Sequence, residues 1–151
     1  MPIVHTVKKA RKTYRGTGIK KGDKYYWWKF RYGSKIKSKV YPKPSQLTQS
    51  EFLSTIYELT DRIEAFSDGL NRADVISEIE DIASEIRSLG EEQEDKRSNM
   101  PDQLQDAPSG ELLEQRAEEC STMADSLESI DTGADLDEIV GEAQSVTYEG
   151  E

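Results

Sequence analysis

The fold of the N-terminal part is decided by residues 25–41, which read YYWWKFRYGSKIKSKVY. Aromatic side chains dominate the first half of this stretch, and lysine returns at every second position from 35 to 39, so both halves are typical of strands. Gly33 and Ser34 supply a turn between them, and Pro42 and Pro44 end the second strand because proline cannot donate to a central ladder. With a first strand at residues 3–7, the sequence predicts a small antiparallel sheet of about three strands.

The register of this hairpin decides which side chains share a face. A two-residue turn at Gly33-Ser34 would place Trp28 and Phe30 beside lysines, whereas a three-residue loop over 33–35 separates apolar from cationic side chains. Because a one-residue slip swaps every side chain between faces, the cleaner segregation favours the three-residue loop. One face would then be apolar, with Tyr26, Trp28, Phe30, Ile36 and Val40. The other, outer face would carry Tyr25, Trp27, Lys29, Arg31, Lys37 and Lys39.

Charge is divided unevenly along the chain. Residues 1–45 hold 14 of the 20 Lys and Arg residues and one acidic residue, Asp23, for a net charge of +13. Residues 46–151 hold the other 6 basic and 29 acidic residues, for a net charge of −23. Such asymmetry is typical of a polyanion-binding segment joined to an acidic module. Since cations neutralise phosphates and flat rings stack on exposed bases, the outer face is predicted to bind DNA or RNA. The alternative is that the sheet face is merely solvated, and that the basic and acidic halves of the chain neutralise one another.

Residues 26–33, YWWKFRYG, resemble the small three-stranded arm-site DNA-binding domains of phage integrases and their plant AP2-type relatives. The lysine-rich second strand, through Ser38 and Tyr41, and a following helix belong to the same resemblance. In that family the sheet face enters a DNA groove, which implies this role for Trp27, Lys29, Arg31, Lys37 and Lys39. No integrase catalytic domain follows here, so recombinase activity is not implied. The whole chain is also similar to small phage-encoded proteins with a basic aromatic head and an acidic helical tail, which implies a phage setting.

From Thr48 onward the apolar period changes from 2 to 3.5 residues. Two stripes with intervals of four and three residues predict two helices, and the short connection near 67–71 favours an antiparallel hairpin. Gly69 is expected to stop the first helix, Asn71 to cap the second and Gly90 to end it. The stripes are Phe52, Ile56, Leu59, Ile63 and Phe66 in the first helix, and Val75, Ile79, Ile82, Ile86 and Leu89 in the second.

A polar segment with two prolines, residues 91–110, is predicted to be a linker. A third helix follows, whose stripe includes Leu113, Ala117, Cys120, Ala124 and Leu127. Cys120 lies on that stripe and is therefore expected to be a small core residue. A weak fourth helix is expected at 134–144, before a frayed end. Because each stripe is narrow, the third helix or a second subunit should complete the bundle.

The predicted fold class is α+β: a small antiparallel sheet followed by acidic α-helices that form a hairpin or a coiled-coil-like bundle. Its predicted parts are a basic sheet at 1–45, a helical hairpin at 46–90, the linker at 91–110 and a third acidic helix with a frayed tail at 111–151.

Catalytic motifs are not evident in the sequence. One cysteine and one histidine leave no disulfide and no Cys/His metal cluster, and residues 16–22, GTGIKKG, lack the spacing of a P-loop. The carboxylates fall on helical surfaces and not in an apolar pocket that would separate their pKa values. We therefore expect a non-enzyme without cofactor or metal. No run of 18 apolar residues indicates a membrane span, and a reduced cytoplasmic compartment, that of the host cell for a phage protein, fits best.

The predicted function is that of an accessory nucleic-acid-binding protein whose helices oligomerise or recruit a protein partner. A first alternative is a protein-directed modulator, in which the acidic helices imitate a DNA backbone and occupy a DNA-binding enzyme of the host or the phage. A second is a structural component of a virion. The sequence by itself does not choose between DNA and RNA.

Overall fold

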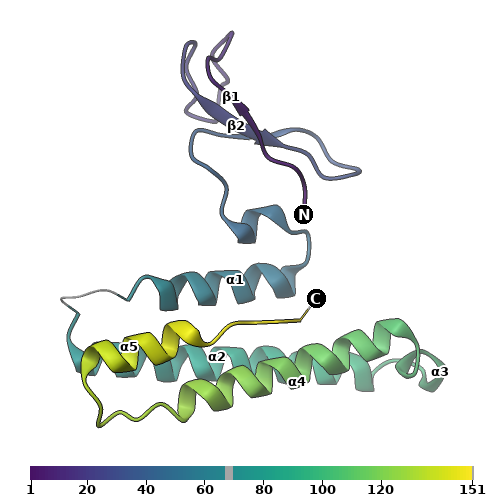
Figure 1. Ribbon diagram of the computed structural model, residues 1–151. Helices are drawn as coiled ribbons and strands as arrows, with labels where there is room; N and C mark the ends of the chain where they lie inside the picture. The colour runs from purple at the N-terminus through teal and green to yellow at the C-terminus, as the bar shows by residue number, and fades with distance from the viewer. Residues whose placement is uncertain (67–69, 151) are drawn as a thin grey trace. The chain divides into compact units, whose positions relative to one another are not determined.

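Figure 1 shows the computed structural model, which describes residues 1–66 and 70–150. Over these residues the chain forms one three-stranded antiparallel sheet and five α-helices, which confirms the predicted α+β fold class. The chain divides into two compact units, Met1–Ser54 and Thr55–Glu151, which we call unit 1 and unit 2. The helix stop predicted at Gly69 lies outside the described residues.

The sheet of unit 1 has the strand order β1-β2-β3. β1 spans His5–Val7, β2 spans Tyr25–Trp28 and β3 spans Ile36–Ser38. Each strand is shorter than predicted. The pairing of β1 begins only at His5, and the backbone leaves the ladder after Trp28 in β2 and after Ser38 in β3. A short 3-10 helix, η1 at Pro44–Leu47, follows the sheet, and proline stands at its first position.

The predicted hairpin register is wrong. β2 pairs Trp28 with Ile36 and Trp27 with Lys37, so residues 29–35 form a longer connection in place of a three-residue loop. The partner of Trp28 moves by an even number of residues, from Val40 to Ile36. Side chains alternate with a period of two, so the predicted separation of faces survives: Trp28 and Ile36 share one face, and Trp27 and Lys37 share the other.

The β1–β2 connection, residues 8–24, packs on the face that carries Tyr25. Ala10, Ile19 and Tyr25 form the buried cluster of this face, with the partly buried Val7, Tyr14 and Trp27 against it. Backbone hydrogen bonds hold the connection in place, including Ala10 N to Asp23 O at 2.8 Å and Tyr14 N to Ile19 O at 2.9 Å. Gly16 and Gly18, with φ of +80° and +69°, form the turn that brings Ile19 back beside Tyr14.

Unit 2 is helical. α1 spans Glu51–Glu64 and enters unit 2 at Thr55, and α2 spans Arg72–Ser98. α3 spans Asp102–Gln105, α4 spans Pro108–Glu128 and α5 spans Leu136–Ser145. α2 runs antiparallel to α4 and also contacts α5, as Figure 1 shows.

Polar contacts join these helices across their edges. Arg87 on α2 reaches Asp125 and Glu128 on α4, at 2.9 and 2.8 Å. From α5, the Gln144 side chain donates to the Phe66 carbonyl oxygen beyond the end of α1, at 3.2 Å. Such exposed ion pairs contribute little stability individually, so burial of the apolar stripes holds the unit together.

Most side chains on the predicted stripes are buried, whereas Leu89, Leu113 and Ala117 are half-buried. Cys120 is fully buried, as expected for a small core residue, and so is Ile139 on α5. The helix predicted as the third, which is α4 in the structure, therefore completes the core together with α5. The buried members of the first two stripes are Phe52, Ile56, Leu59, Ile63, Phe66, Val75, Ile79, Ile82 and Ile86.

Two helix boundaries differ from prediction. α2 passes through Gly90 and ends at Ser98, and α4 begins at Pro108, so most of the expected linker at 91–110 is helical. The predicted cap of α2 is confirmed, because the Asn71 side-chain oxygen accepts from Ala73 N at 3.2 Å. In the described ranges, no helix combines the length and the apolar content needed to cross a membrane.

Candidate nucleic-acid interface

The cations of unit 1 lie in its connections. Every Lys and Arg among residues 1–45 except Lys37 falls outside the three strands, and each of these is exposed. Eight of them are in the β1–β2 connection and three, Lys29, Arg31 and Lys35, in the β2–β3 connection at 29–35. Lys37, on β3, is half-buried. The positive charge is therefore presented by loops and not by a strand face.

The predicted outer face of the sheet is a packed face. Tyr25 is only 7% exposed, because the β1–β2 connection covers it. Its hydroxyl shares a hydrogen bond with that of Tyr14 at 3.4 Å, and this bond, together with burial, raises the pKa of Tyr25. Tyr25 therefore belongs to the core of unit 1, and the prediction that it lies on an open binding platform is wrong.

Trp27 is half-buried and already has two partners. The His5 ring stacks on its indole with centroids 4.2 Å apart and an angle of 15° between the planes. The Lys35 ammonium lies 4.3 Å from the ring centroid, a cation–π distance. A nucleic-acid base would have to displace one of these groups to stack on Trp27, so this residue is not the free platform that the sequence suggested.

Lys37 and Lys39 also have partners within unit 1. The Lys37 ammonium lies 4.5 Å from the Tyr14 ring centroid, and the Lys39 ammonium lies 3.3 Å from the Asp23 carboxylate. A hydrogen bond from the backbone N–H of Lys20, then the bond from Lys39, lowers the pKa of Asp23. Asp23, the one acidic residue among residues 1–45, therefore links the β1–β2 connection to Lys39, which follows β3.

On the opposite face of the sheet no strand residue is a cation, but the ammonium of Lys24, which precedes β2, lies 5.2 Å from the Tyr26 ring centroid. The strand residues of this face are Thr6, Tyr26, Trp28, Ile36 and Ser38. Trp28 is buried, and the Tyr26 ring meets the Tyr41 ring edge-on with centroids 5.3 Å apart. The strand residues of neither face therefore combine open rings with cations as the sequence predicted.

The β2–β3 connection does bring an open ring and cations together. Lys29, Arg31 and Lys35 are exposed, and Tyr32 is 89% exposed. The Arg31 guanidinium lies 5.4 Å from the Tyr32 ring centroid. Gly33 N donates to Phe30 O at 3.1 Å, which closes the turn beneath Tyr32.

Two of the predicted residues, Lys29 and Arg31, are thus part of this group, and Trp27 contacts it through Lys35. Tyr25, Lys37 and Lys39 are not part of it. Sequence reasoning missed Tyr32 and Lys35 as site residues because it sought the site on the sheet face, with Tyr32 at the end of a strand and Lys35 in the three-residue loop. The signal that could have identified them is their position beside Gly33 and Ser34, since a turn at a hairpin tip exposes its side chains.

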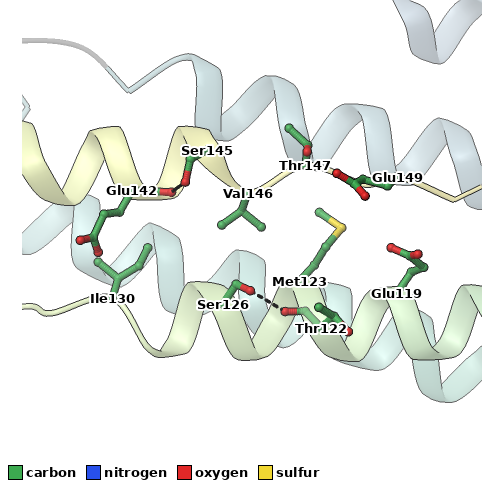
Figure 2. A pocket seen from close by; sticks show the side chains of 10 residues that line it. All are labelled: Glu119, Thr122, Met123, Ser126, Ile130, Glu142, Ser145, Val146, Thr147 and Glu149. Atoms are coloured by element: carbon green, nitrogen blue, oxygen red, sulfur yellow. Dashed lines mark hydrogen bonds between the residues drawn. The ribbon is translucent and has the colours of Figure 1, made fainter.

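Unit 2 contains a groove of about 440 Å³ between α4 and the end of α5 with the residues that follow it (Figure 2). Met123, Ile130 and Val146 give it an apolar part, and the carboxylates of Glu119, Glu142 and Glu149 stand around it. No basic residue is among its lining residues, so it cannot attract phosphate. Over 1–66 and 70–150, no group of three or more His, Cys, Asp or Glu side chains is placed to hold a metal ion.

No protein-family model, curated protein or solved structure matches the chain. Function is therefore inferred from the charges, rings and packing of the two units.

Proposed function

We propose that this protein is a non-enzymatic nucleic-acid-binding protein, in which unit 1 contacts the phosphate backbone through the cations of its connections. The observation that carries this proposal is that 14 of 20 basic residues fall within residues 1–45, all exposed except Lys37, with Asp23 as the only acidic residue among them. A linear polyanion is the ligand class that such a surface attracts, because each phosphate contact releases bound counterions.

Nucleic acid is favoured over other polyanions by the exposed ring of Tyr32 among these cations. A polyphosphate has no face on which a ring can stack, whereas every base has a π-face. The overall charge of −10 is the sum of +13 on residues 1–45 and −23 on residues 46–151, so it does not describe the segment that carries the proposal.

Unit 2 is proposed to serve oligomerisation or the recruitment of a protein partner. Its exposed acidic side chains repel phosphate, so a direct contact of this unit with nucleic acid is disfavoured. The accessory role belongs to the same proposal, as does the phage setting that the resemblance of the whole chain implies.

The proposal is tested by fluorescence anisotropy with the full-length protein and labelled oligonucleotides, at salt concentrations between about 50 and 200 mM. The variant combines Lys29→Ala with Arg31→Ala. We expect weaker binding and a slope of log affinity against log salt that is smaller by roughly one unit for each lost phosphate contact.

The matched control is Lys96→Ala, which removes a cation from α2 in unit 2, where it pairs with exposed Glu92. It should leave both the affinity and the slope unchanged. If the full-length protein binds no oligonucleotide at the lowest salt, or if the control weakens binding as much as the double variant, the proposal is wrong.

A further inference from the structure

Resting on the proposed function, we infer that the ligand of unit 1 is single-stranded nucleic acid, held by stacking of an unpaired base on Tyr32 with phosphates on Lys29, Arg31 and Lys35. This inference goes beyond phosphate binding, because it names the form of nucleic acid and the residue that recognises it.

The first step is that most rings of unit 1 are already engaged. Tyr14 and Tyr25 contact each other, Trp27 lies against His5 and Lys35, and Trp28 is 3% exposed. Tyr26 and Tyr41 contact each other edge-on. Tyr32 is the most exposed of the large apolar and aromatic side chains in the described part of the chain, and the group that lies over its ring is the guanidinium of the neighbouring Arg31.

The second step is that unit 1 lacks a surface suited to reading a duplex. Direct readout in the major groove uses an α-helix or a β-ribbon whose outward side chains reach base edges. One face of this sheet is covered by the β1–β2 connection, and the strand residues of the other carry no cation and no amide side chain. The cation that reaches this second face, Lys24, lies over the Tyr26 ring. Before α1, the only helix is the four-residue η1.

The third step concerns what Tyr32 can reach. Bases inside a duplex already stack on both faces, so a ring can insert only by unstacking a base step. An unpaired base has free faces, and its backbone is flexible enough to bring phosphates to cations on either side of the ring. Lys29 and Arg31 precede Tyr32 and Lys35 follows it, which places cations on both sides along the connection.

The experiment compares three labelled ligands of one mixed sequence with the full-length protein: single-stranded DNA, single-stranded RNA and duplex DNA. We expect at least one single strand to bind roughly tenfold or more tightly than the duplex. Tyr32→Ala should weaken single-strand binding by roughly 5- to 150-fold, the range that loss of one stacked base implies, and change duplex binding little.

Two further variants separate stacking from other effects. Tyr32→Phe keeps the flat ring and should retain single-strand affinity, whereas Tyr32→Leu keeps an apolar side chain without the ring and should behave like Tyr32→Ala. Melting temperatures equal to that of the unmodified protein establish that unit 1 is folded, as expected for a side chain 89% exposed.

Equal affinity for the duplex and both single strands would overturn this inference, and so would an unchanged single-strand affinity of Tyr32→Ala. Either result would leave the proposed binding of phosphates by unit 1 intact. Absence of binding to all three ligands at low salt would instead overturn the proposed function itself. A difference between the DNA and RNA single strands would support the inference and identify the preferred sugar.

Discussion

Gly90 of α2 lies directly against Cys120 of α4. A Cβ atom added to Gly90 would come 2.9 Å from the Cys120 Cβ and 3.3 Å from the Ala117 carbonyl oxygen. A Cβ contact of 2.9 Å essentially never occurs in real structures, and 3.3 Å is also tight, so the two helices approach this closely because residue 90 lacks a side chain. This close approach explains why a glycine lies inside α2 although the sequence pattern predicts a helix end.

Gly90→Ala is therefore expected to destabilise unit 2 by roughly 1–3 kcal/mol, because overpacking at the α2–α4 contact outweighs the better helix propensity of alanine. The matched control is Gly141→Ala on α5, where an added Cβ would meet nothing within 4 Å. That change should stabilise the protein by roughly 0.5–1 kcal/mol. Thermal and chemical unfolding measure both, and a stabilising Gly90→Ala would contradict the close contact.

Alkaline pH is expected to weaken unit 2 through Cys120. Burial raises the pKa of the Cys120 thiol from 9.0 to about 11. Above pH 9.0 the unfolded chain loses this proton while the folded chain keeps it, so stability is lost between these two values, by up to roughly 2–3 kcal/mol. Below pH 9.0 the thiol contributes no pH dependence.

Chemical denaturation of the protein and of Cys120→Ala, below pH 9.0 and near pH 11, checks this expectation. The variant should lose less stability over that interval. Burial also raises the pKa of Tyr148, to about 12, so some loss at higher pH should remain in the variant. Identical pH profiles for the two proteins would show that the thiol does not titrate with folding.

Asp23→Asn is expected to increase the affinity of unit 1 for nucleic acid. The substitution removes the one negative charge of residues 1–45 and releases Lys39, which now pairs with Asp23 at 3.3 Å. The salt dependence should become steeper by roughly one unit of log–log slope if Lys39 gains a phosphate contact. An amide oxygen can still accept from Lys20 N, so unit 1 should stay folded.

Glu91→Gln, on an exposed position of α2, removes the same charge from unit 2 and is the control. Its effect on affinity should be smaller than that of Asp23→Asn. Anisotropy titrations at two salt concentrations compare the variants. An equal gain from both would show that only the net charge of the protein matters, and not the pairing of Lys39.

Local patterns in the sequence determined the element types. The 4-3-4-3 spacing of Ile56, Ile63, Ile79 and Ile86 with their neighbours predicted helices and their buried stripes, because both follow from a period fixed by the backbone. Likewise, the alternation around Trp28 and Ile36 predicted the correct pair of strand faces, although the register was wrong. The division of charge at residue 45 is also a property of the sequence alone.

Tertiary structure decided what covers those faces. The sequence does not show that the β1–β2 connection packs on Tyr25 and Trp27, because that contact joins segments through a long glycine-containing loop with no periodic pattern. Nor does it show that Gly90 faces Cys120, since the close approach depends on how two helices cross. The cations and Tyr32 consequently meet on the β2–β3 connection and not on the sheet, because packing left that connection exposed.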